Sequence, residues 1–426
     1  MYKITEYGAI ADASTVNTSA INNTIKSCFE NGGGTVYVPS GTFLTGSIEM
    51  KSNVNLFLET GAELLFINDE AEYPLVYTRW EGSEQKCYRS CIYGENVENV
   101  AILGYGTING NGKWWWDLFA NKANKYPRPT CISFVRSKRI TISDVKIVNS
   151  PSWTVHPLQS ANITINNVTI VNPKNSPNTD GIDPESCHEV RISNCYIDVG
   201  DDCIAIKAGV ETANEAIACR NIAITNCTMI NGHGGVVIGS EMSGNVENVV
   251  ISNCIFEGTD RGIRLKSRRG RGGSVNDISI NNIIMNNVIC PFIMNLYYFC
   301  GVGGKKAHVS DKSAQPITPS TPVFKKIYIS NVIAKNVHAA AGFIYGLAEM
   351  YVEDVHFNDV NVYMKEENAE PGFPAMMAEI APMKQQGFYC RNAKNITFSN
   401  TLINGCKGEK FDVGEECDVI INNAHI

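Results

Sequence analysis

Two stretches decide the fold, VVISNC at residues 249–254 and ISINNI at residues 278–283. In both, apolar side chains recur at alternate positions and the fifth residue is asparagine. The same pattern, with asparagine or aspartate fifth, is found at residues 140–145, 163–168, 190–195, 222–227 and 327–332. Successive units start 23, 27, 32, 27, 29 and 49 residues apart. These intervals are typical of a repeat protein with an insertion before its last unit.

Each unit predicts a short β-strand, because alternation with a period of two places the apolar side chains on one face. Repeated strands of this kind favour an all-β fold, a right-handed parallel β-helix in which each coil covers the core of the next. The chain has 426 residues, a length that would otherwise suggest about three globular domains. The repeat instead predicts a single β-helical domain over residues 1–426.

Segments outside the repeat are expected to cap or interrupt it. Residues 1–50 predict an N-terminal cap around an amphipathic helix at residues 18–30, whose apolar face holds Ile21, Ile25 and Phe29. Loop insertions are predicted at residues 67–130, which are aromatic and charged, and at residues 300–323, which are rich in glycine and proline. Residues 355–426 are expected to form the last coils and a C-terminal cap.

The composition is that of an ordinary soluble protein, with a net charge of −7, 19% charged and 44% hydrophobic residues. It gives no reason to expect a nucleic-acid partner, and no stretch approaches the roughly 18 apolar residues of a membrane span. The first residues show no basic region followed by an apolar run, so no secretory signal is expected.

The chain contains fifteen cysteines. Three of them, Cys195, Cys227 and Cys254, follow the asparagine of a repeat unit, where a small inward-facing residue belongs. We interpret them as a buried stack of thiols in a reducing compartment, in preference to disulfides or metal ligands. With the missing signal, this predicts a cytoplasmic protein.

Four polar clusters interrupt the apolar strands: NTD at residues 178–180, GDD at 200–202, GHG at 232–234 and RLK at 264–266. We align the strands that begin at Ile182, Ile204, Val236 and Ile263. Asp180 and Asp202 then each lie two residues before a strand, whereas Asp201 and His233 lie three residues before one. Equivalent residues of successive coils are about 4.8 Å apart. The clusters are therefore expected to stack into one site.

Neighbouring carboxyl groups raise one another's proton affinity, which separates an acid from a base. Glycoside hydrolysis needs such a pair, one carboxyl to protonate the leaving oxygen and another to activate water or attack carbon. Arg264 and Lys266 beside the carboxylates indicate an anionic sugar. A single cluster of this kind is usually turn chemistry, but four in one register indicate a site.

In order and spacing, the four clusters resemble glycoside hydrolase family 28, the polygalacturonases, with Leu265 in place of the commoner isoleucine. The resemblance extends over about residues 1–400. It implies hydrolysis of α-1,4-linked galacturonate with inversion and without a metal or other cofactor. By the same resemblance Asp201 is the general acid, Asp180 and Asp202 hold the attacking water, and His233 orients and polarises the acid pair. Arg264, Lys266, Asn178 and Tyr298 would bind substrate, although Tyr297 adjoins Tyr298.

Further residues are candidates for sugar contacts. Arg79 and Trp80 resemble a segment of bacterial exo-acting members and are expected to line the subsite for the non-reducing end. His156 is either a sugar contact or structural, Trp153 either core or contact, and Asp183 either structural or an acceptor for a sugar hydroxyl. At least one residue of Trp114–Trp116 is expected to meet substrate or a loop.

A basic group, Arg268, Arg269 and Arg271, fits a solvated face, a nucleic-acid patch or a polyanionic sugar, of which we favour the sugar.

The expected activity is hydrolysis of pectic oligogalacturonides from the non-reducing end. Endo-polygalacturonase and rhamnogalacturonan hydrolase are alternatives within the family. A calcium-dependent pectate lyase is an alternative from another class, with Asp180, Asp183, Asp201 and Asp202 as candidate ligands. A non-catalytic β-helix would need no such group of carboxylates. The sequence does not indicate an oligomeric state.

Overall fold

A computed structural model describes residues 1–423 of the chain. They fall into two compact units, Met1–Asp201 and Asp202–Ile426, each of which is described here by itself. The helices are α1 (Thr18–Glu30), α2 (Lys113–Ala120) and α3 (Ala307–Ser310), with short 3-10 turns at Ile4–Tyr7 and Glu70–Glu72. Within the described residues, no helix is long and apolar enough to cross a bilayer.

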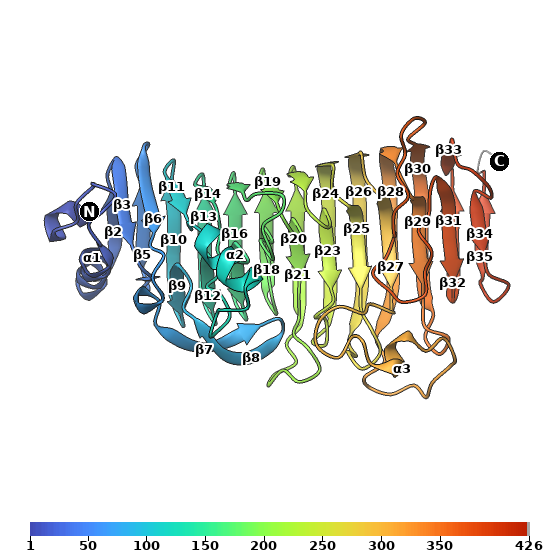
Figure 1. Cartoon of the computed structure of the whole chain (residues 1–426), viewed down its shortest axis with the longest axis horizontal. Helices are drawn as coiled ribbons and strands as arrows, with labels where there is room; N and C mark the ends of the chain where they lie inside the picture. Colours follow the sequence, from blue (N-terminus) through green and yellow to red (C-terminus); the bar gives the residue numbers. More distant parts are fainter. Residues whose placement is uncertain (424–426) are drawn as a thin grey trace. The chain divides into compact units, whose positions relative to one another are not determined.

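The first unit consists of coils of parallel strands (Figure 1). One ladder joins β2, β5, β10, β13, β16 and β18, a second joins β3, β6, β11, β14, β17 and β19, and a third joins β4, β9, β12 and β15. The strands of the unit are β1 (Tyr2–Lys3), β2 (Gly34–Val38), β3 (Gly41–Thr45), β4 (Ile48–Glu49), β5 (Val54–Leu58), β6 (Ala62–Phe66), β7 (Leu75–Trp80), β8 (Ser83–Tyr88), β9 (Ile92–Glu95), β10 (Glu98–Gly104), β11 (Thr107–Asn109), β12 (Ile132–Val135), β13 (Lys138–Ser143), β14 (Lys146–Val148), β15 (Val155–Leu158), β16 (Ala161–Asn166), β17 (Thr169–Val171), β18 (His188–Ser193) and β19 (Tyr196–Val199).

The second unit is built in the same way from longer strands. Its outer ladder runs through β21, β24, β26, β28, β30, β32 and β35, and its other ladder through β20, β23, β25, β27, β29, β31 and β34. The strands are β20 (Ile204–Ile206), β21 (Cys219–Thr225), β22 (Thr228–Asn231), β23 (Val236–Gly239), β24 (Val246–Glu257), β25 (Arg261–Lys266), β26 (Ser274–Asn286), β27 (Cys290–Asn295), β28 (Val323–Val337), β29 (Ala340–Tyr345), β30 (Val352–Met364), β31 (Gln386–Arg391), β32 (Ala393–Ser399), β33 (Leu402–Asn404), β34 (Phe411–Val413) and β35 (Val419–Asn422). The predicted parallel β-helical fold is confirmed.

The repeated asparagine has a conformational cause. All seven fifth-position residues adopt the left-handed conformation, with φ between 52° and 70°: Asp144, Asn167, Asn194, Asn226, Asn253, Asn282 and Asn331. Asparagine and aspartate enter this region more readily than other residues that carry a side chain. Their amides also pair along the corner, as where Asn282 Nδ2 donates to Asn253 Oδ1 at 3.1 Å. Each corner therefore turns the chain and pairs with the next.

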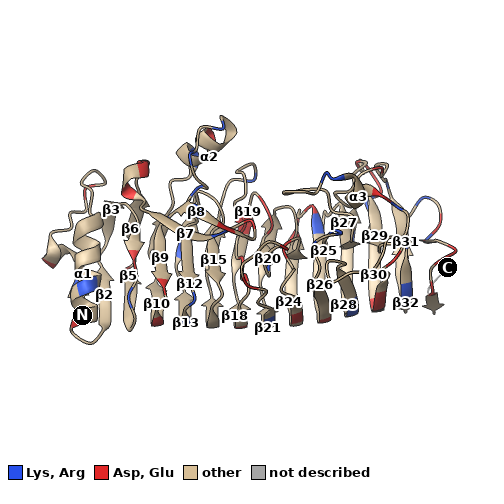
Figure 2. Cartoon of the chain, turned by 90° about the horizontal axis from the view of Figure 1, so that it is seen from below, with Lys and Arg blue, Asp and Glu red and all other residues tan. Residues whose placement is uncertain are grey.

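The prediction of one loop insertion at residues 67–130 is wrong in part. Residues 92–109 form a regular coil, β9 to β11, and Ile102 pairs in register with Ile142. The coil was missed because Gly104 occupies the corner that Asp144 occupies in the next coil, and glycine reaches the same region without the asparagine signature (φ 105°). The true interruptions are the β7–β8 hairpin and α2, which stands out from the strands (Figure 2).

The helix predicted at residues 18–30 is present as α1 and lies against β2 and β4, while its capping role stays a prediction. Ile21 and Ile25 are buried as expected, but Phe29 is 44% exposed and Cys28 is buried in its place. At about 100° per residue, position 28 lies close to the Ile21 direction and position 29 about 80° from it. The single-domain prediction also stays a prediction.

We expect the left-handed corners to tolerate glycine but not a β-branched residue. Asn282→Val should lower the free energy of unfolding by about 1–2 kcal/mol, because its Cβ is strained at φ 54°. Asn282→Gly should cost less. Denaturant unfolding measures both variants. The control is Asn281→Val, at the preceding strand position of β26; an equal loss there would show that corner conformation is not the cause.

Candidate active site

The centre of the site in the second unit is the carboxylate of Asp202, which is 1% exposed. Lys266 Nζ lies 2.8 Å from Oδ2 and Arg264 Nη1 lies 3.3 Å from Oδ1. Register puts these cations near Asp202, because β20, β23 and β25 pair in order and both Arg264 and Lys266 face away from the core residues Ile263 and Leu265. Burial favours protonation, but Lys266, Arg264 and Lys207 hold the pKa of Asp202 well below its usual range. Asp202 is therefore an ionised carboxylate.

Tyr298 lies beside the same cations, whereas Tyr297 does not. The Tyr298 ring centre is 5.3 Å from Lys266 Nζ and 5.8 Å from the Arg264 guanidinium carbon. Tyr297 is 1% exposed and its ring faces Lys312 Nζ at 3.6 Å. Of the two neighbouring tyrosines, Tyr298 is thus placed to contact a ligand of the cations.

His233 has a partner that sequence reasoning missed. His233 Nδ1 lies 2.8 Å from Asp260 Oδ2. The signal was available, because Val236 and Ile263 pair in register and His233 and Asp260 each precede them by three residues. His233 and Asp260 therefore lie in one column of the second unit.

In the first unit, Gly200 is held against Thr179 immediately before Asp201. Gly200 N donates to Thr179 Oγ1 at 3.3 Å, and Thr179 is fully buried. A Cβ on Gly200 would lie 2.4 Å from the Ser176 carbonyl oxygen, so only glycine fits this approach. This contact fixes the backbone immediately before Asp201, the last residue of the unit.

Asn178 is held by Arg128, which the sequence analysis did not select. Arg128 Nη2 donates to Asn178 Oδ1 at 2.7 Å, and Nη1 donates to the carbonyls of Pro151 and Pro177. Burial lowers the pKa of Arg128 to about 10, while the charges of Glu81 and Asp180 act the other way. Asp180, which is 3% exposed, thus lies in the field of a buried cation.

The model of glycosyl hydrolases family 28 matches residues 28–371. The chain belongs to this family. A probable polygalacturonase of Vitis vinifera is 36% identical over 350 residues, which cover 79% of this chain and 69% of the relative. An endo-polygalacturonase of Pectobacterium carotovorum subsp. carotovorum is 32% identical over 332 residues, covering 73% and 79%.

Solved structures agree with the family 28 assignment. The crystal structure of a hyperthermoactive exopolygalacturonase from Thermotoga maritima superposes with a TM-score of 0.75 at 28% identity. The superposition covers 99% of this chain and 91% of the other. The predicted membership of family 28 is therefore confirmed, and so is the β-helical fold.

Of the further candidates for sugar contacts, Arg79 and His156 are buried, whereas Trp80 is half-buried. Arg79 and His156 are each 2% exposed and share Glu185, at 3.3 Å from Arg79 Nη1 and 3.0 Å from His156 Nε2. Trp80 stacks on Trp153 at 4.8 Å. Glu185, fully buried, was not selected from the sequence. A sugar contact by Arg79, Trp80 or His156 stays a prediction.

The arginine group is not a solvated face. Arg268, Arg269 and Arg271 are 2–5% exposed, with Glu211 2.7 Å from Arg268 and 2.8 Å from Arg271, and Glu349 2.5 Å from Arg269. Arg268 and Arg269 also donate to backbone carbonyls of the insertion between β27 and β28. The group therefore holds that loop in place.

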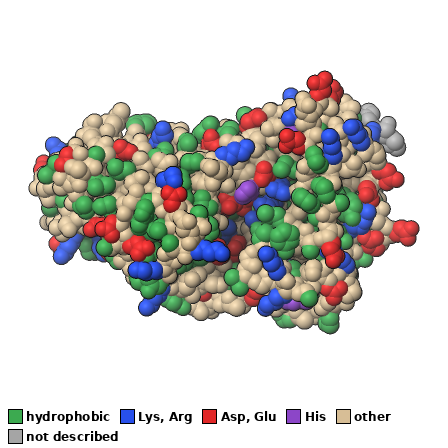
Figure 3. All heavy atoms as spheres, in the orientation of Figure 1, with side chains coloured by type: hydrophobic (Ala, Val, Ile, Leu, Met, Phe, Trp, Pro, Cys, Tyr) green, Lys and Arg blue, Asp and Glu red, His purple; other side chains and the backbone are tan. Residues whose placement is uncertain are grey.

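On the face drawn in Figure 3, acidic and basic side chains are interspersed.

Of the three consecutive tryptophans, Trp115 is buried and the other two are half-buried, and one contacts a loop, as expected. Trp115 is fully buried against Tyr73 and Tyr88, whereas Trp116 Nε1 donates to the Ser150 carbonyl. Cys195, Cys227 and Cys254 are buried, as predicted from their position in the repeat. Asp183 is also fully buried.

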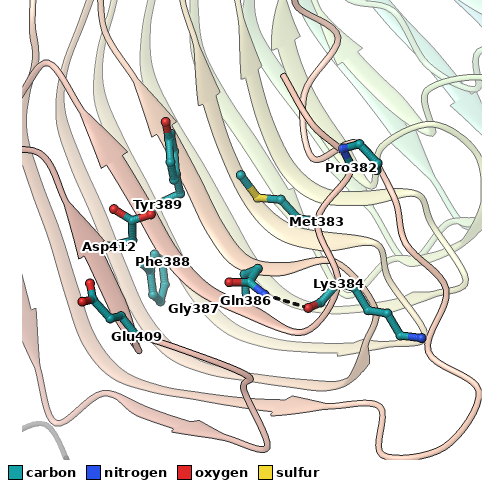
Figure 4. A pocket seen from close by; sticks show the side chains of 9 residues that line it. All are labelled: Pro382, Met383, Lys384, Gln386, Gly387, Phe388, Tyr389, Glu409 and Asp412. Carbon is teal, nitrogen blue, oxygen red and sulfur yellow. Dashed lines mark hydrogen bonds between the residues drawn. The ribbon is translucent and has the colours of Figure 1, made fainter. Parts of the chain in front are cut away.

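A separate pocket of about 440 Å³ lies at the outer face of β31 (Figure 4). Met383, Lys384, Tyr389, Glu409 and Asp412 are among its lining residues. It contains none of the residues selected from the sequence.

Glu241 gives a pH test of the charge network around the site. Burial acts to raise its pKa, but Lys207, Arg271 and Lys266 lower it to about 2 from 4.5, and Lys207 Nζ lies 3.6 Å from Oε2. Since the folded-state pKa is depressed, its stabilisation is present above pH 4.5 and is lost as the pH falls towards 2. Glu241→Gln should therefore cost about 3 kcal/mol of unfolding free energy at pH 7 and much less at pH 3.

Denaturant titrations at both pH values measure this difference. Glu247→Gln, on β24, is the control and should change stability by less than about 0.5 kcal/mol at either pH. A Glu241→Gln loss that is equal at pH 7 and pH 3 would contradict the expected charge effect.

Proposed function

We propose that this chain is a polygalacturonase that hydrolyses α-1,4-galacturonosyl linkages of pectic oligogalacturonides with inversion, releasing sugar from the non-reducing end. Asp201 donates the proton to the leaving oxygen, and Asp180 and Asp202 hold the attacking water. His233 orients and polarises the acid pair. Arg264 and Lys266, with Asn178 and Tyr298, bind the sugar.

The observation that carries the proposal is the contact of Asp202 with Arg264 and Lys266. Inverting hydrolysis requires one carboxyl that keeps its proton for the leaving group and one that stays ionised to activate water. Two cations within 3.3 Å suit Asp202 to the ionised role. The resemblance to the family motif gives the acid role to Asp201, its neighbour in the chain.

The same cations favour a uronate as substrate. Arginine and lysine both form charge-assisted hydrogen bonds to carboxylates, and the Tyr298 ring offers an apolar face next to them. The charges of Arg264 and Lys266 attract the carboxylate of a uronate, which a neutral sugar lacks.

Exo action is supported by two features. The β7–β8 hairpin, which carries Arg79 and Trp80, and the insertion between β27 and β28 are bulky additions to a regular coil. Such additions suit a cleft that is closed at one end. The likeness to the Thermotoga maritima exopolygalacturonase points in the same direction, although the Pectobacterium relative is an endo-polygalacturonase.

Replacement of the acid tests the chemical step. Asp201→Asn keeps the shape of the side chain but removes the transferable proton, so kcat on oligogalacturonides should fall by about 10²–10⁴. Reducing-sugar release measures kcat, and circular dichroism checks the fold. Retention of more than about a tenth of the wild-type kcat would show that Asp201 is not the general acid.

Replacement of a cation tests both uronate binding and the state of Asp202. Lys266→Met should lower kcat/KM at least tenfold, because a charge-assisted contact of about 1.5–3 kcal/mol is lost. With Lys266 absent the pKa of Asp202 should rise, so the acid limb of the kcat profile should move to higher pH. The control is Lys326→Met, because the ammonium of Lys326 lies on the outer ladder near Asp277. An unchanged acid limb would show that Lys266 does not control the pKa of Asp202.

The mode of cleavage is tested by comparing viscosity with reducing-end release on polygalacturonate. Exo action should release monomer or dimer while viscosity falls slowly. A rapid fall with a ladder of mixed oligomers would establish the endo alternative. The calcium-dependent lyase alternative would instead show unsaturated products and loss of activity with EDTA, and both Asp202 oxygens already contact cationic side chains.

A further inference from the structure

Asp260 is built into the site next to His233 by the backbone as well as by its side chain. Asp260 N donates to the Gly232 carbonyl at 2.9 Å, which places the two residues side by side on consecutive coils of the second unit. His233 Nδ1 then lies 2.8 Å from Asp260 Oδ2. The His233 side chain is 45% exposed. Nδ1 is thus engaged by Asp260, and Nε2 lies on the opposite side of the ring.

Arg261 prevents Asp260 from turning away. Arg261 Nη1 donates to Asp260 Oδ2 at 3.3 Å. Its other nitrogens donate to the Phe373 carbonyl at 2.7 Å and the Pro374 carbonyl at 3.2 Å. Arg261 is 7% exposed, so its guanidinium is held from both sides. The carboxylate that meets His233 is therefore fixed by a buried cation, which is itself fixed to the backbone.

The charges around Asp260 and His233 keep Asp260 ionised. In that form it accepts a hydrogen bond from a ring N–H. Burial acts to raise the pKa of Asp260, but the bond from His233 and the charges of Arg261 and Arg264 leave it lowered. Asp202 lies on the coil before that of His233. Its Oδ1 is 3.4 Å from the position that a Cβ on Gly234 would take. An ionised Asp260 can only accept, so the neutral imidazole must carry its hydrogen on Nδ1.

We propose that Asp260 is the positioning residue for His233: it accepts the Nδ1 hydrogen, fixes one tautomer and ring orientation, and so presents Nε2 to the reacting groups. The inference deepens the proposed function, on which it rests for the catalytic role of His233. An orienting carboxylate of this kind settles which nitrogen is able to exchange a proton. Without it, both neutral tautomers of His233 would be populated and only one would be useful.

The experiment compares Asp260→Ala and Asp260→Asn with the wild-type chain by NMR of selectively labelled histidine, without substrate. The chain has seven histidines, and a His233→Gln variant assigns the signal. In the wild type, His233 should show the Nδ1–H tautomer. Loss of the neighbouring charge should lower the midpoint pH of the His233 titration by about one unit or more in both variants. Asp260→Ala should also mix the two tautomers.

Activity provides the second readout. Kcat on oligogalacturonides should fall at least tenfold in both Asp260 variants, while KM changes by less than about threefold, since binding groups are untouched. Asp277→Asn, at an exposed carboxylate on β26, is the matched control and should leave both readouts at wild-type values. Asp260→Asn retains the side-chain volume, so it keeps the test available if Asp260→Ala does not fold.

A purely structural role for Asp260 predicts a different pattern. If Asp260 only anchors Arg261, Arg261→Met should reproduce the loss of activity, and the His233 tautomer and midpoint should stay unchanged in every folded variant. That result would overturn the inference. The NMR readout does not need the enzyme reaction, so a shifted midpoint in a chain that fails to cleave galacturonan would refute the proposed function alone.

Discussion

In-register parallel pairing is the constraint on which the rest of this structure depends. Each strand residue pairs with its equivalent one coil away, as Val249 pairs with Ile278 and Ile278 with Ile327. Equivalent positions must therefore share backbone conformation as well as side-chain direction. The left-handed corners follow from this requirement, because a corner with another conformation would break the ladder on both sides. Asparagine recurs there since it adopts the conformation and also pairs through its amide.

The same constraint concentrates charge within the second unit. The strands β20, β23 and β25 pair in register about one strand spacing apart, so the two cations of β25 come within reach of Asp202, which precedes β20. Asp202 keeps its charge in a buried position only because Arg264 and Lys266 reach it from two coils further along the chain. An unpaired carboxylate at 1% exposure would instead take up a proton. Rigid strands thus set both the position of the group and its ionisation state.

The limits of sequence reasoning are physical ones. The register of Asp202, His233, Arg264 and Lys266 could be counted, because they belong to the repeat. Asp260 belongs to the repeat too, since it precedes Ile263 by three residues as His233 precedes Val236, but it lies outside the four motifs. Arg128 and Glu185 could not be found in this way. They act through contacts between segments of unrelated spacing, such as Arg128 to Asn178 and Arg79 to Glu185. The coil at residues 92–109 was hidden because glycine meets the corner requirement without the asparagine signature.

What the sequence determined by itself was whatever repeats: the β-helical fold, the buried face of each strand, and the order of the motifs that identify family 28. Alternation and corner conformation are local properties, so they can be read along the chain. Only the tertiary structure decided which charges are in contact and which are buried. It placed Arg268, Arg269 and Arg271 in ion pairs inside the protein, and chose Tyr298 over Tyr297 as the ring beside the cations. Burial and ionisation depend on the neighbours that fold around a side chain, and those neighbours come from distant parts of the sequence.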